Sequence, residues 1–315
     1  MQSVRQGAIP LFRLAGVQVS LHWSWFLIAA YEIESGKSRY GSIVWNIFEY
    51  LALFLIVLTH EFGHAMACRQ VGGTANSILL WPFGGVAYVN PPQRPGATLW
   101  SIAAGPLVNV ALWPILSVAI MVARSAGWAD TNPDAYLLLL WIRRIDIGLL
   151  IFNILPIYPL DGGQILRSLL WFVMGRARSL LVATVVGFIG LAGFIALAVL
   201  YRDYWLGLIS IYLVLSCWGG LQHARQLLRM AKLPRRPGFA CPSCRTAPPV
   251  GAYWVCGACK QPFDTFETGA VCPNCSTRFN STRCLDCGEQ RPINDWAVGS
   301  YAGVGTINGG APSKS

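Results

Sequence analysis

Long apolar stretches alternate with short polar ones over about the first 220 residues of the chain. A helix needs about 20 apolar residues to cross roughly 30 Å of hydrocarbon. Six stretches approach or reach that length, at approximately residues 17–33, 45–68, 98–123, 135–157, 179–200 and 204–222. The pattern therefore predicts an all-α polytopic membrane protein with about six transmembrane helices.

Two of these stretches contain ionisable residues, which are costly at membrane depth. The first is short and contains His22, and the fourth contains Arg143, Arg144 and Asp146. The cluster in the fourth stretch leaves two alternatives open. Either this span begins near Ile145 after an interfacial helix, or its charges are paired inside the protein.

The segment ILLWPFGGVAYVNPP, between the second and third stretches, does not fit a membrane helix. It is too short to cross and is interrupted by Pro82, Gly84 and Gly85. Because apolar and small residues alternate in it, we expect a β-hairpin or a re-entrant loop at the cytoplasmic interface. The alternative is a turn that dips into the interface. Non-helical backbone at membrane depth must be buried in protein or line a cavity.

Composition and charge support a membrane protein and suggest its orientation. Only 12% of the residues are charged, against about a quarter in soluble domains. Cytoplasmic loops collect Lys and Arg, and the basic loop residues fall mainly on the side that holds both predicted chain ends. We therefore expect a multi-pass protein with cytoplasmic N- and C-termini. No cleavable signal peptide is evident, so we expect the first apolar stretch to be retained.

The cysteines divide the chain, because eight of the ten form four C-x-x-C pairs after residue 240. This segregation predicts a small metal-binding module attached to the membrane body. The expected parts are a cytoplasmic N-terminal segment 1–16, a membrane domain 17–223, a basic linker 224–240, a cysteine module 241–290 and a disordered Gly- and Ser-rich tail 291–315.

The stretch FLIVLTHEFGHAMAC places His60, Glu61 and His64 in an otherwise apolar helix. The i, i+4 spacing puts both histidines on one helix face, where they can bind one zinc ion while Glu61 deprotonates its water. The alternative is a chance motif, or histidines hydrogen-bonded within a bundle. We favour the metal, because three buried ionisable groups without a partner are costly.

A catalytic zinc usually takes three protein ligands and a water. The best third ligand is Asp161 in FNILPIYPLDGGQIL, where Pro156 and Pro159 break the helix and leave Asp161 on unwound backbone. A helix-ending turn with a capping Asp is the alternative. The predicted topology favours the ligand, because it places Asp161 and the two histidines at the cytoplasmic ends of their spans.

The motifs HEFGH, AAGPLVNV and NILPIYPLDGG together resemble the site-2 protease family of intramembrane zinc metalloproteases, over roughly residues 10–222. The resemblance is greatest to the bacterial branch that includes the sporulation-factor-processing proteases, which implies a bacterial cytoplasmic membrane. It implies zinc on His60, His64 and Asp161, with Glu61 as the general base. The segment RRIDIGLL is more charged than the fourth span of this family usually is.

The resemblance also implies supporting roles for four other residues. Asn109 and Asn153 are expected to contact the substrate or the oxyanion, and interhelical hydrogen bonding is the alternative for both. Gly84 and Gly85 are expected to lie on a strand edge that holds an extended substrate. The activity implied is hydrolysis of peptide bonds in membrane-spanning substrates near the cytoplasmic face. A silent scaffold and a metal transporter are the alternatives, and Glu61 favours the protease because neither needs a base.

The C-x-x-C pairs predict two structural zinc ribbons with four cysteine ligands each. Disulfides are the alternative, which a reducing cytoplasm disfavours. Sequential pairing is the default, and an interleaved arrangement is the other option. We expect the module to bind a regulatory protein or nucleic acid, or the linker to bind anionic lipid. The eight predicted ligands are Cys241, Cys244, Cys256, Cys259, Cys272, Cys275, Cys284 and Cys287.

Overall fold

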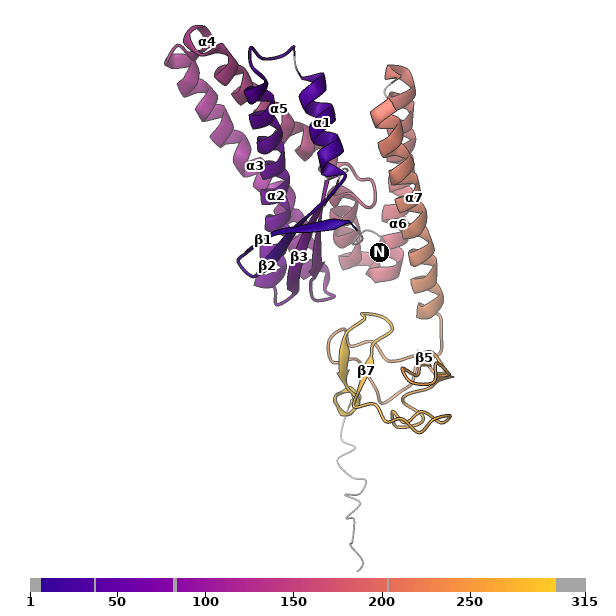
Figure 1. Ribbon diagram of the computed structural model, residues 1–315. Helices are drawn as coiled ribbons and strands as arrows, with labels where there is room; N and C mark the ends of the chain where they lie inside the picture. The colour runs from indigo at the N-terminus through magenta and orange to yellow at the C-terminus, as the bar shows by residue number, and fades with distance from the viewer. Residues whose placement is uncertain (1–6, 37, 82–83, 203, 299–315) are drawn as a thin grey trace, which may run out of the picture. The chain divides into compact units, whose positions relative to one another are not determined.

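The structure, a computed structural model, describes residues 7–36, 38–81, 84–202 and 204–298 (Figure 1). The chain divides into two compact units, Met1–Gln226 and Leu227–Ser315. The first unit contains most of the helices and a four-stranded sheet. The helices are α1 Trp25–Ser35, α2 Ile43–Gln70, α3 Pro95–Ser125, α4 Trp128–Thr131, α5 Pro133–Ile154, α6 Asp161–Tyr201 and α7 Tyr204–Ala231.

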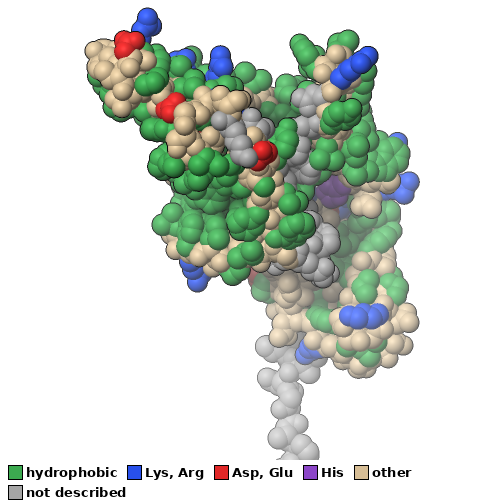
Figure 2. Space-filling view, turned by 45° about the horizontal axis from the view of Figure 1, so that its top comes forward, with side chains coloured by type: hydrophobic (Ala, Val, Ile, Leu, Met, Phe, Trp, Pro, Cys, Tyr) green, Lys and Arg blue, Asp and Glu red, His purple; other side chains and the backbone are tan. Residues whose placement is uncertain are grey.

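The described residues contain four helices that are long and apolar enough to cross a membrane: α2, α3, α6 and the part of α7 from Leu206 to Ala231. Helices α2, α3 and α5 lie side by side (Figure 1). Hydrophobic side chains cover much of the face shown in Figure 2, and charged ones are sparse on it. These features are those of a protein whose helices are embedded in lipid.

The first predicted span, 17–33, is wrong as a single helix. Its first part forms strand β2, Val17–His22, and only eleven residues form α1. A helix of that length is about 16 Å long, roughly half of the hydrocarbon thickness. The reason lies in the sequence VQVSLH, which buries Val17, Val19 and Leu21 at the two-residue period of a strand.

The fourth predicted span does not begin near Ile145. Helix α5 begins at Pro133 and runs without a break through Arg143, Arg144 and Asp146. The Asp146 side chain is fully buried and accepts a hydrogen bond from Asn109 of α3. Of the two alternatives, a partner inside the protein is therefore correct for Asp146, and that partner is the neutral amide of Asn109 rather than a cation.

The hairpin predicted after the second helix is present and belongs to a larger sheet. Strands β1 Ala8–Leu14, β2, β3 Thr74–Trp81 and β4 Gly84–Asn90 follow one another across it, with β2 and β3 parallel and the other pairs antiparallel. The bend of the hairpin, with Pro82, lies outside the described residues. The register pairs Ile78 of β3 with Ala87 of β4.

The sheet packs against α2, and this packing places the hairpin beside the predicted site. Buried side chains of β2 and β3 form one apolar core with Val57, Leu58 and Ala65 of α2. At the last turn of α2, the Arg69 guanidinium donates to the backbone carbonyls of Ala15, Gly16 and Ala75. The end of the helix is thereby bound to β3 and to the turn between β1 and β2.

The second unit is a small module with a core of cysteine and aromatic side chains. Two short antiparallel pairs, β5 Trp254–Val255 with β6 Pro262–Phe263 and β7 Ser281–Arg283 with β8 Gln290–Pro292, are followed by the 3-10 helix η2, Ile293–Trp296.

The boundaries of this module differ from the predicted ones. Helix α7 continues to Ala231, inside the predicted linker. Trp296 is fully buried, and its carbonyl accepts a hydrogen bond from the Ala240 N–H at 2.7 Å. Residues 291–298 therefore belong to the module and not to a disordered tail. The rest of the predicted tail, 299–315, lies outside the described residues.

Candidate metal centre

Two helices bring His60, His64 and Asp161 together in the first unit. The Nε2 atoms of the two histidines lie 3.1 Å apart, and Oδ2 of Asp161 lies 3.0 Å from that of His60 and 3.3 Å from that of His64. All three side chains are buried. Three side chains that the sequence spacing singled out therefore converge on one point.

Each histidine has its Nδ1 atom engaged away from this point. Nδ1 of His60 lies 2.6 Å from Oδ1 of Asn109, and Nδ1 of His64 lies 2.9 Å from the backbone carbonyl oxygen of Ser101. Because both oxygens are acceptors, each Nδ1 carries the proton and each Nε2 presents a lone pair to the Asp161 carboxylate. Lone pairs in such contact repel one another unless a cation lies between them, so the donor set fits a metal ion.

The separations also fit zinc. A tetrahedral zinc ion with ligand bonds of about 2.0–2.1 Å holds its ligand atoms roughly 3.3–3.4 Å apart. The three donor atoms found here lie 3.0 to 3.3 Å from one another. Two imidazoles and one carboxylate would hold a zinc ion with three protein ligands, the ligand number of catalytic rather than structural zinc sites.

Glu61 lies beside this centre and faces a cavity of about 670 Å³. Its Oε2 accepts a hydrogen bond of 2.8 Å from the backbone N–H of Ala87 in β4. The cavity is also lined by His60, His64 and Asp161. A carboxylate, the three residues that would hold a metal ion and a strand backbone therefore meet in one cavity.

Asp161 is the first residue of α6 and follows the irregular segment 155–160. The Leu160 backbone N–H donates to the Ile157 carbonyl at 2.8 Å, which holds this segment in a tight turn. Behind the turn, a Cβ on Gly163 would lie 2.6 Å from the Tyr158 nitrogen, so only glycine fits there. Asp161 thus begins a helix after unwound backbone, and its carboxylate points at the histidines.

The four residues implied by resemblance lie in two different places. Asn153, Gly84 and Gly85 line the cavity. Asn109 is fully buried behind His60 and is not among the lining residues. In this structure its amide therefore contacts a histidine rather than the space open to a substrate.

Gly105 of α3 is a residue of the site that the sequence analysis missed. A Cβ built on it would overlap the His64 imidazole and lie 2.7 Å from Nε2 of His60. No side chain larger than hydrogen therefore fits beside the donor atoms. The signal was present in AAGPLVNV, where a glycine stands four residues, about one helical turn, before Asn109.

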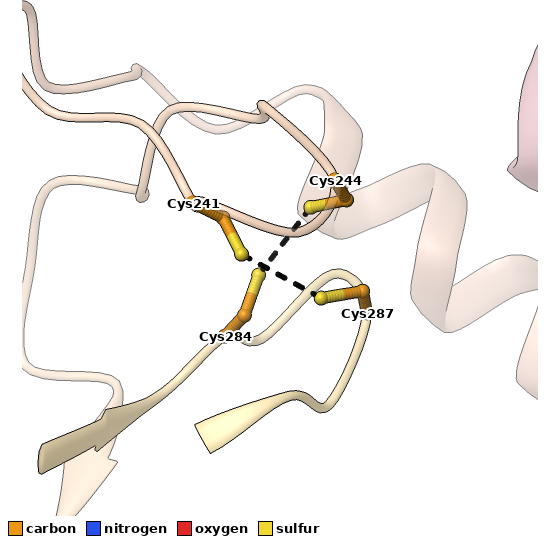
Figure 3. Close-up of side chains that lie close together, drawn as sticks. All are labelled: Cys241, Cys244, Cys284 and Cys287. Carbon is orange, nitrogen blue, oxygen red and sulfur yellow. Dashed lines mark hydrogen bonds between the residues drawn. The ribbon is translucent and has the colours of Figure 1, made fainter. Parts of the chain in front are cut away.

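The cysteines of the second unit form two clusters of four. One contains Cys241, Cys244, Cys284 and Cys287, shown in Figure 3, and the other contains Cys256, Cys259, Cys272 and Cys275. The outer two C-x-x-C pairs thus join, and the inner two join. The default sequential pairing is wrong, and the arrangement is nested rather than interleaved.

The sulfur separations fit metal sites and not disulfides. Between facing pairs the Sγ atoms lie 3.6 to 3.7 Å apart. A disulfide bond is about 2.05 Å long, whereas four sulfurs at about 2.3 Å from one zinc ion lie roughly 3.8 Å apart. The pKa of the Cys244 thiol is lowered to about 5, and the largest cause is a hydrogen bond from the Cys284 thiol. A lowered pKa favours the thiolate, which is the form that binds metal.

The same turn is repeated at all four C-x-x-C pairs. In each, the residue after the second cysteine has a positive φ, between 57° and 79°, and its N–H donates to the carbonyl of the first cysteine. The N–H of the first cysteine in turn donates to the carbonyl of the residue that follows the one with positive φ, five positions after the first cysteine. The four residues with positive φ are Arg245, Lys260, Ser276 and Gly288.

Two arginines of the predicted linker are used inside the module. Arg235 forms a two-pronged ion pair with Asp286, at 2.6 and 3.1 Å, and Arg236 binds Asp264 at 2.6 Å. Burial alone would raise the pKa of Asp264, but the Gly251 N–H and Arg236 outweigh it and lower that pKa. These two arginines therefore serve the fold of the module, which weakens the expectation that they bind lipid or nucleic acid.

The fold and the site together define a class of protein. Apolar helices of membrane-spanning length carry two histidines, the Asp161 carboxylate and an adjacent glutamate around one cavity. This is the donor set of a metallohydrolase in the setting of a polytopic membrane protein.

Comparison with known proteins gives the family. The family model described as Peptidase family M50 matches residues 48–132 and 116–197. These stretches contain both histidines, Glu61 and Asp161. The chain belongs to peptidase family M50, the site-2 protease family, and the resemblance found in its motifs is confirmed.

Similar proteins include zinc metalloprotease MJ0392 of Methanocaldococcus jannaschii, which is 31% identical over 180 residues, 57% of this chain and 50% of that protein. Stage IV sporulation protein FB of Bacillus subtilis is 28% identical over 158 residues, 48% of this chain and 46% of that protein. A solved structure, the site-2 protease from Methanocaldococcus jannaschii, matches with a TM-score of 0.50 and 27% identity, over 68% of this chain and 95% of that one. The chain spans about half the length of the curated relatives it matches.

Replacing Gly105 by Ala should remove metal from the membrane unit. The added methyl group meets both imidazoles, so the Nε2 atoms cannot keep their positions. Metal analysis of the purified protein should show one zinc per chain less than in the wild type. Gly193→Ala is the matched control, because a Cβ at that helical glycine has no heavy atom within 4 Å. Full zinc content in Gly105→Ala would contradict the geometry of the site.

Double cysteine substitutions should distinguish nested from sequential clusters. Cys241→Ala with Cys284→Ala removes two ligands of one cluster, so the protein should lose one zinc per chain. Cys241→Ala with Cys256→Ala removes one ligand from each cluster and should lose two. Sequential pairing predicts the reverse, and metal analysis of the two double variants decides between them.

Proposed function

We propose that the chain is an intramembrane zinc metalloprotease that hydrolyses peptide bonds of membrane-spanning substrates near the cytoplasmic face. The observation that carries this proposal is the convergence of His60, His64 and Asp161 beside Glu61 in one cavity. The first three hold the zinc ion. When bound, the ion supplies Lewis acidity that polarises a carbonyl group and acidifies water.

Glu61 is the general base of the proposed reaction. Its side chain lines the cavity, and in the sequence it stands between the two histidines. The Ala87 N–H donates a hydrogen bond to one of its carboxylate oxygens. In this position it accepts a proton from the attacking water and then donates it to the leaving amine. Neither a scaffold nor a metal transporter has use for a proton acceptor at this place.

The free edge of β4 holds the substrate in an extended form. Among the described residues β4 pairs only with β3, so its other edge has no strand partner. The Ala87 N–H points from that edge towards Glu61, and Gly84 and Gly85 of the same strand line the cavity. A transmembrane helix hides its carbonyls in hydrogen bonds and must unwind before attack. Strand addition to β4 stabilises the unwound segment.

The position of the centre along α2 supports a site near one membrane face. His60 and His64 lie within the last three turns of α2, roughly 10–15 Å from its end. Arg69 at that end of α2 and Arg94 at the start of α3 are basic, as expected for a cytoplasmic face. Asn153 lines the same cavity and is the residue that we propose to contact the substrate or the oxyanion.

We also propose that each four-cysteine cluster holds a structural zinc ion. The thiol groups lie at separations that suit a tetrahedral S₄ site, and the buried hydrophobic cluster of the module consists of cysteine and aromatic side chains. Zinc then supplies much of the free energy of folding of this unit. A full complement is three zinc ions per chain.

Glu61→Gln should abolish cleavage while the zinc content stays the same. Removal of a general base lowers the rate by roughly 100-fold or more, and the amide leaves the three ligand residues in place. Purified protein, incubated with single-span candidate substrates, gives the measurement. Glu49→Gln is the matched control, because Glu49 lies on the same helix, binds Tyr40 and is outside the cavity lining.

The outcomes separate the proposed activity from its alternatives. Cleavage that survives Glu61→Gln would contradict the mechanism. Wild-type protein that binds three zinc ions and cleaves no candidate substrate would favour a silent scaffold or a transporter.

A further inference from the structure

Asp146 is a buried carboxylate in the middle of α5 that the proposed reaction does not use. Its side chain is fully buried, and it forms no salt bridge within the described part of the chain. The neighbouring Arg144 lies over the Trp141 ring instead, at 5.1 Å from its centroid. A carboxylate inside a membrane protein without a paired cation is costly and usually marks a functional site.

The one hydrogen-bond partner of Asp146 among the described side chains leads to the metal centre. Nδ2 of Asn109 donates to Oδ1 of Asp146 at 2.7 Å, and Oδ2 of Asp146 has no partner in the described residues. The other end of the same amide, Oδ1 of Asn109, lies 2.6 Å from Nδ1 of His60. Asp146, Asn109 and His60 therefore form one chain across α5, α3 and α2.

The two ends of this chain fix the orientation of the amide. A carboxylate oxygen accepts hydrogen bonds, so the Asn109 NH₂ group turns towards Asp146. The amide oxygen then faces His60 and accepts its Nδ1 proton, which leaves the Nε2 lone pair for the metal. With the amide turned over, its NH₂ group would face Nδ1 and favour the wrong tautomer of the imidazole.

The second histidine, His64, needs no further group to fix its tautomer. Nδ1 of His64 donates to the backbone carbonyl of Ser101, which can only accept. His60 faces an amide side chain, which offers a donor and an acceptor of nearly the same shape. Only at His60 must a further group decide which of the two faces the imidazole.

We propose that Asp146 is a positioning residue for the metal centre, which acts through Asn109 to hold His60 in the tautomer and orientation that bind zinc. This inference rests on the proposed zinc site. Partners behind a ligand histidine typically change metal affinity by about 10- to 100-fold when they are lost.

An exchange of the two side chains tests the inference with little change in volume. Asn109→Asp alone sets two carboxylates against each other, and we expect about 10- to 100-fold weaker zinc binding at the centre. Asn109→Asp with Asp146→Asn restores the chain, because the carboxylate introduced on α3 accepts from both His60 and the amide introduced on α5. We expect this exchange to bring zinc affinity back to within a few-fold of the wild type.

The measurement is competition for zinc between a chelator and the purified full-length chain, with the helical content monitored by circular dichroism. Asp146→Leu should also weaken the binding of one zinc ion per chain, and Asp134→Leu is its control. Asp134 lies on the same helix and accepts a hydrogen bond from the Gly41 N–H at 3.1 Å, away from the centre. If Asp146→Leu does not fold, the exchange decides alone.

His60→Ala separates the failure of this inference from failure of the zinc site. It should lose one zinc equivalent outright, and if it does not, the proposed zinc site itself is wrong. If His60→Ala loses zinc but the exchange recovers none of the affinity, Asp146 does not act through Asn109. An Asp146→Leu variant that holds zinc as tightly as Asp134→Leu would overturn the inference in the same way.

Discussion

Three lone pairs that face one another in a buried site are the constraint on which this structure depends. The Nε2 atoms of His60 and His64 and a carboxylate oxygen of Asp161 lie within 3.3 Å of one another. Such lone pairs repel one another unless a cation lies between them, and other features of the unit fit a metal site here. Ser101 and Asn109 draw the imidazole protons to the far side. Gly105 leaves room beside the imidazole rings, and the irregular segment before α6 places the Asp161 carboxylate next to them.

The centre could be predicted from the sequence because burying its ionisable side chains at membrane depth costs free energy. Three ionisable groups one helical turn apart in an apolar run, and an Asp after two helix-breaking prolines, are unlikely without a shared purpose. The strand before α1 escapes prediction for the opposite reason. Val17–His22 is short, and it is followed within three residues by the apolar helix α1, so that strand and helix together resemble one span. For Asn109, interhelical hydrogen bonding was an expected alternative, but its partners could not be predicted, because they depend on how α2, α3 and α5 pack and not on spacing along the chain.

In the cysteine module, too, the prediction from sequence is limited by contacts between residues that are distant in the chain. All four C-x-x-C pairs form one type of turn, so each is locally equivalent to the others. Local sequence predicts the turns and the ligands, but it holds no information on which pair meets which. The choice is made by distant contacts, such as the ion pair between Arg235 and Asp286 and the burial of Trp296. Nesting then makes the outer cluster join the first and last pairs of the module.

The hydrogen bond between Glu61 and Ala87 has a consequence for how a peptide can pair with β4. One backbone N–H on the open edge of β4 holds the Glu61 carboxylate. A peptide carbonyl placed opposite Ala87 would compete with Glu61 for this N–H. If the peptide of the proposed reaction adds to this edge, its register must leave the Ala87 N–H to Glu61, so that the carboxylate keeps the position from which it accepts a proton. The hydrogen bond therefore limits which residue of a peptide can lie opposite Ala87.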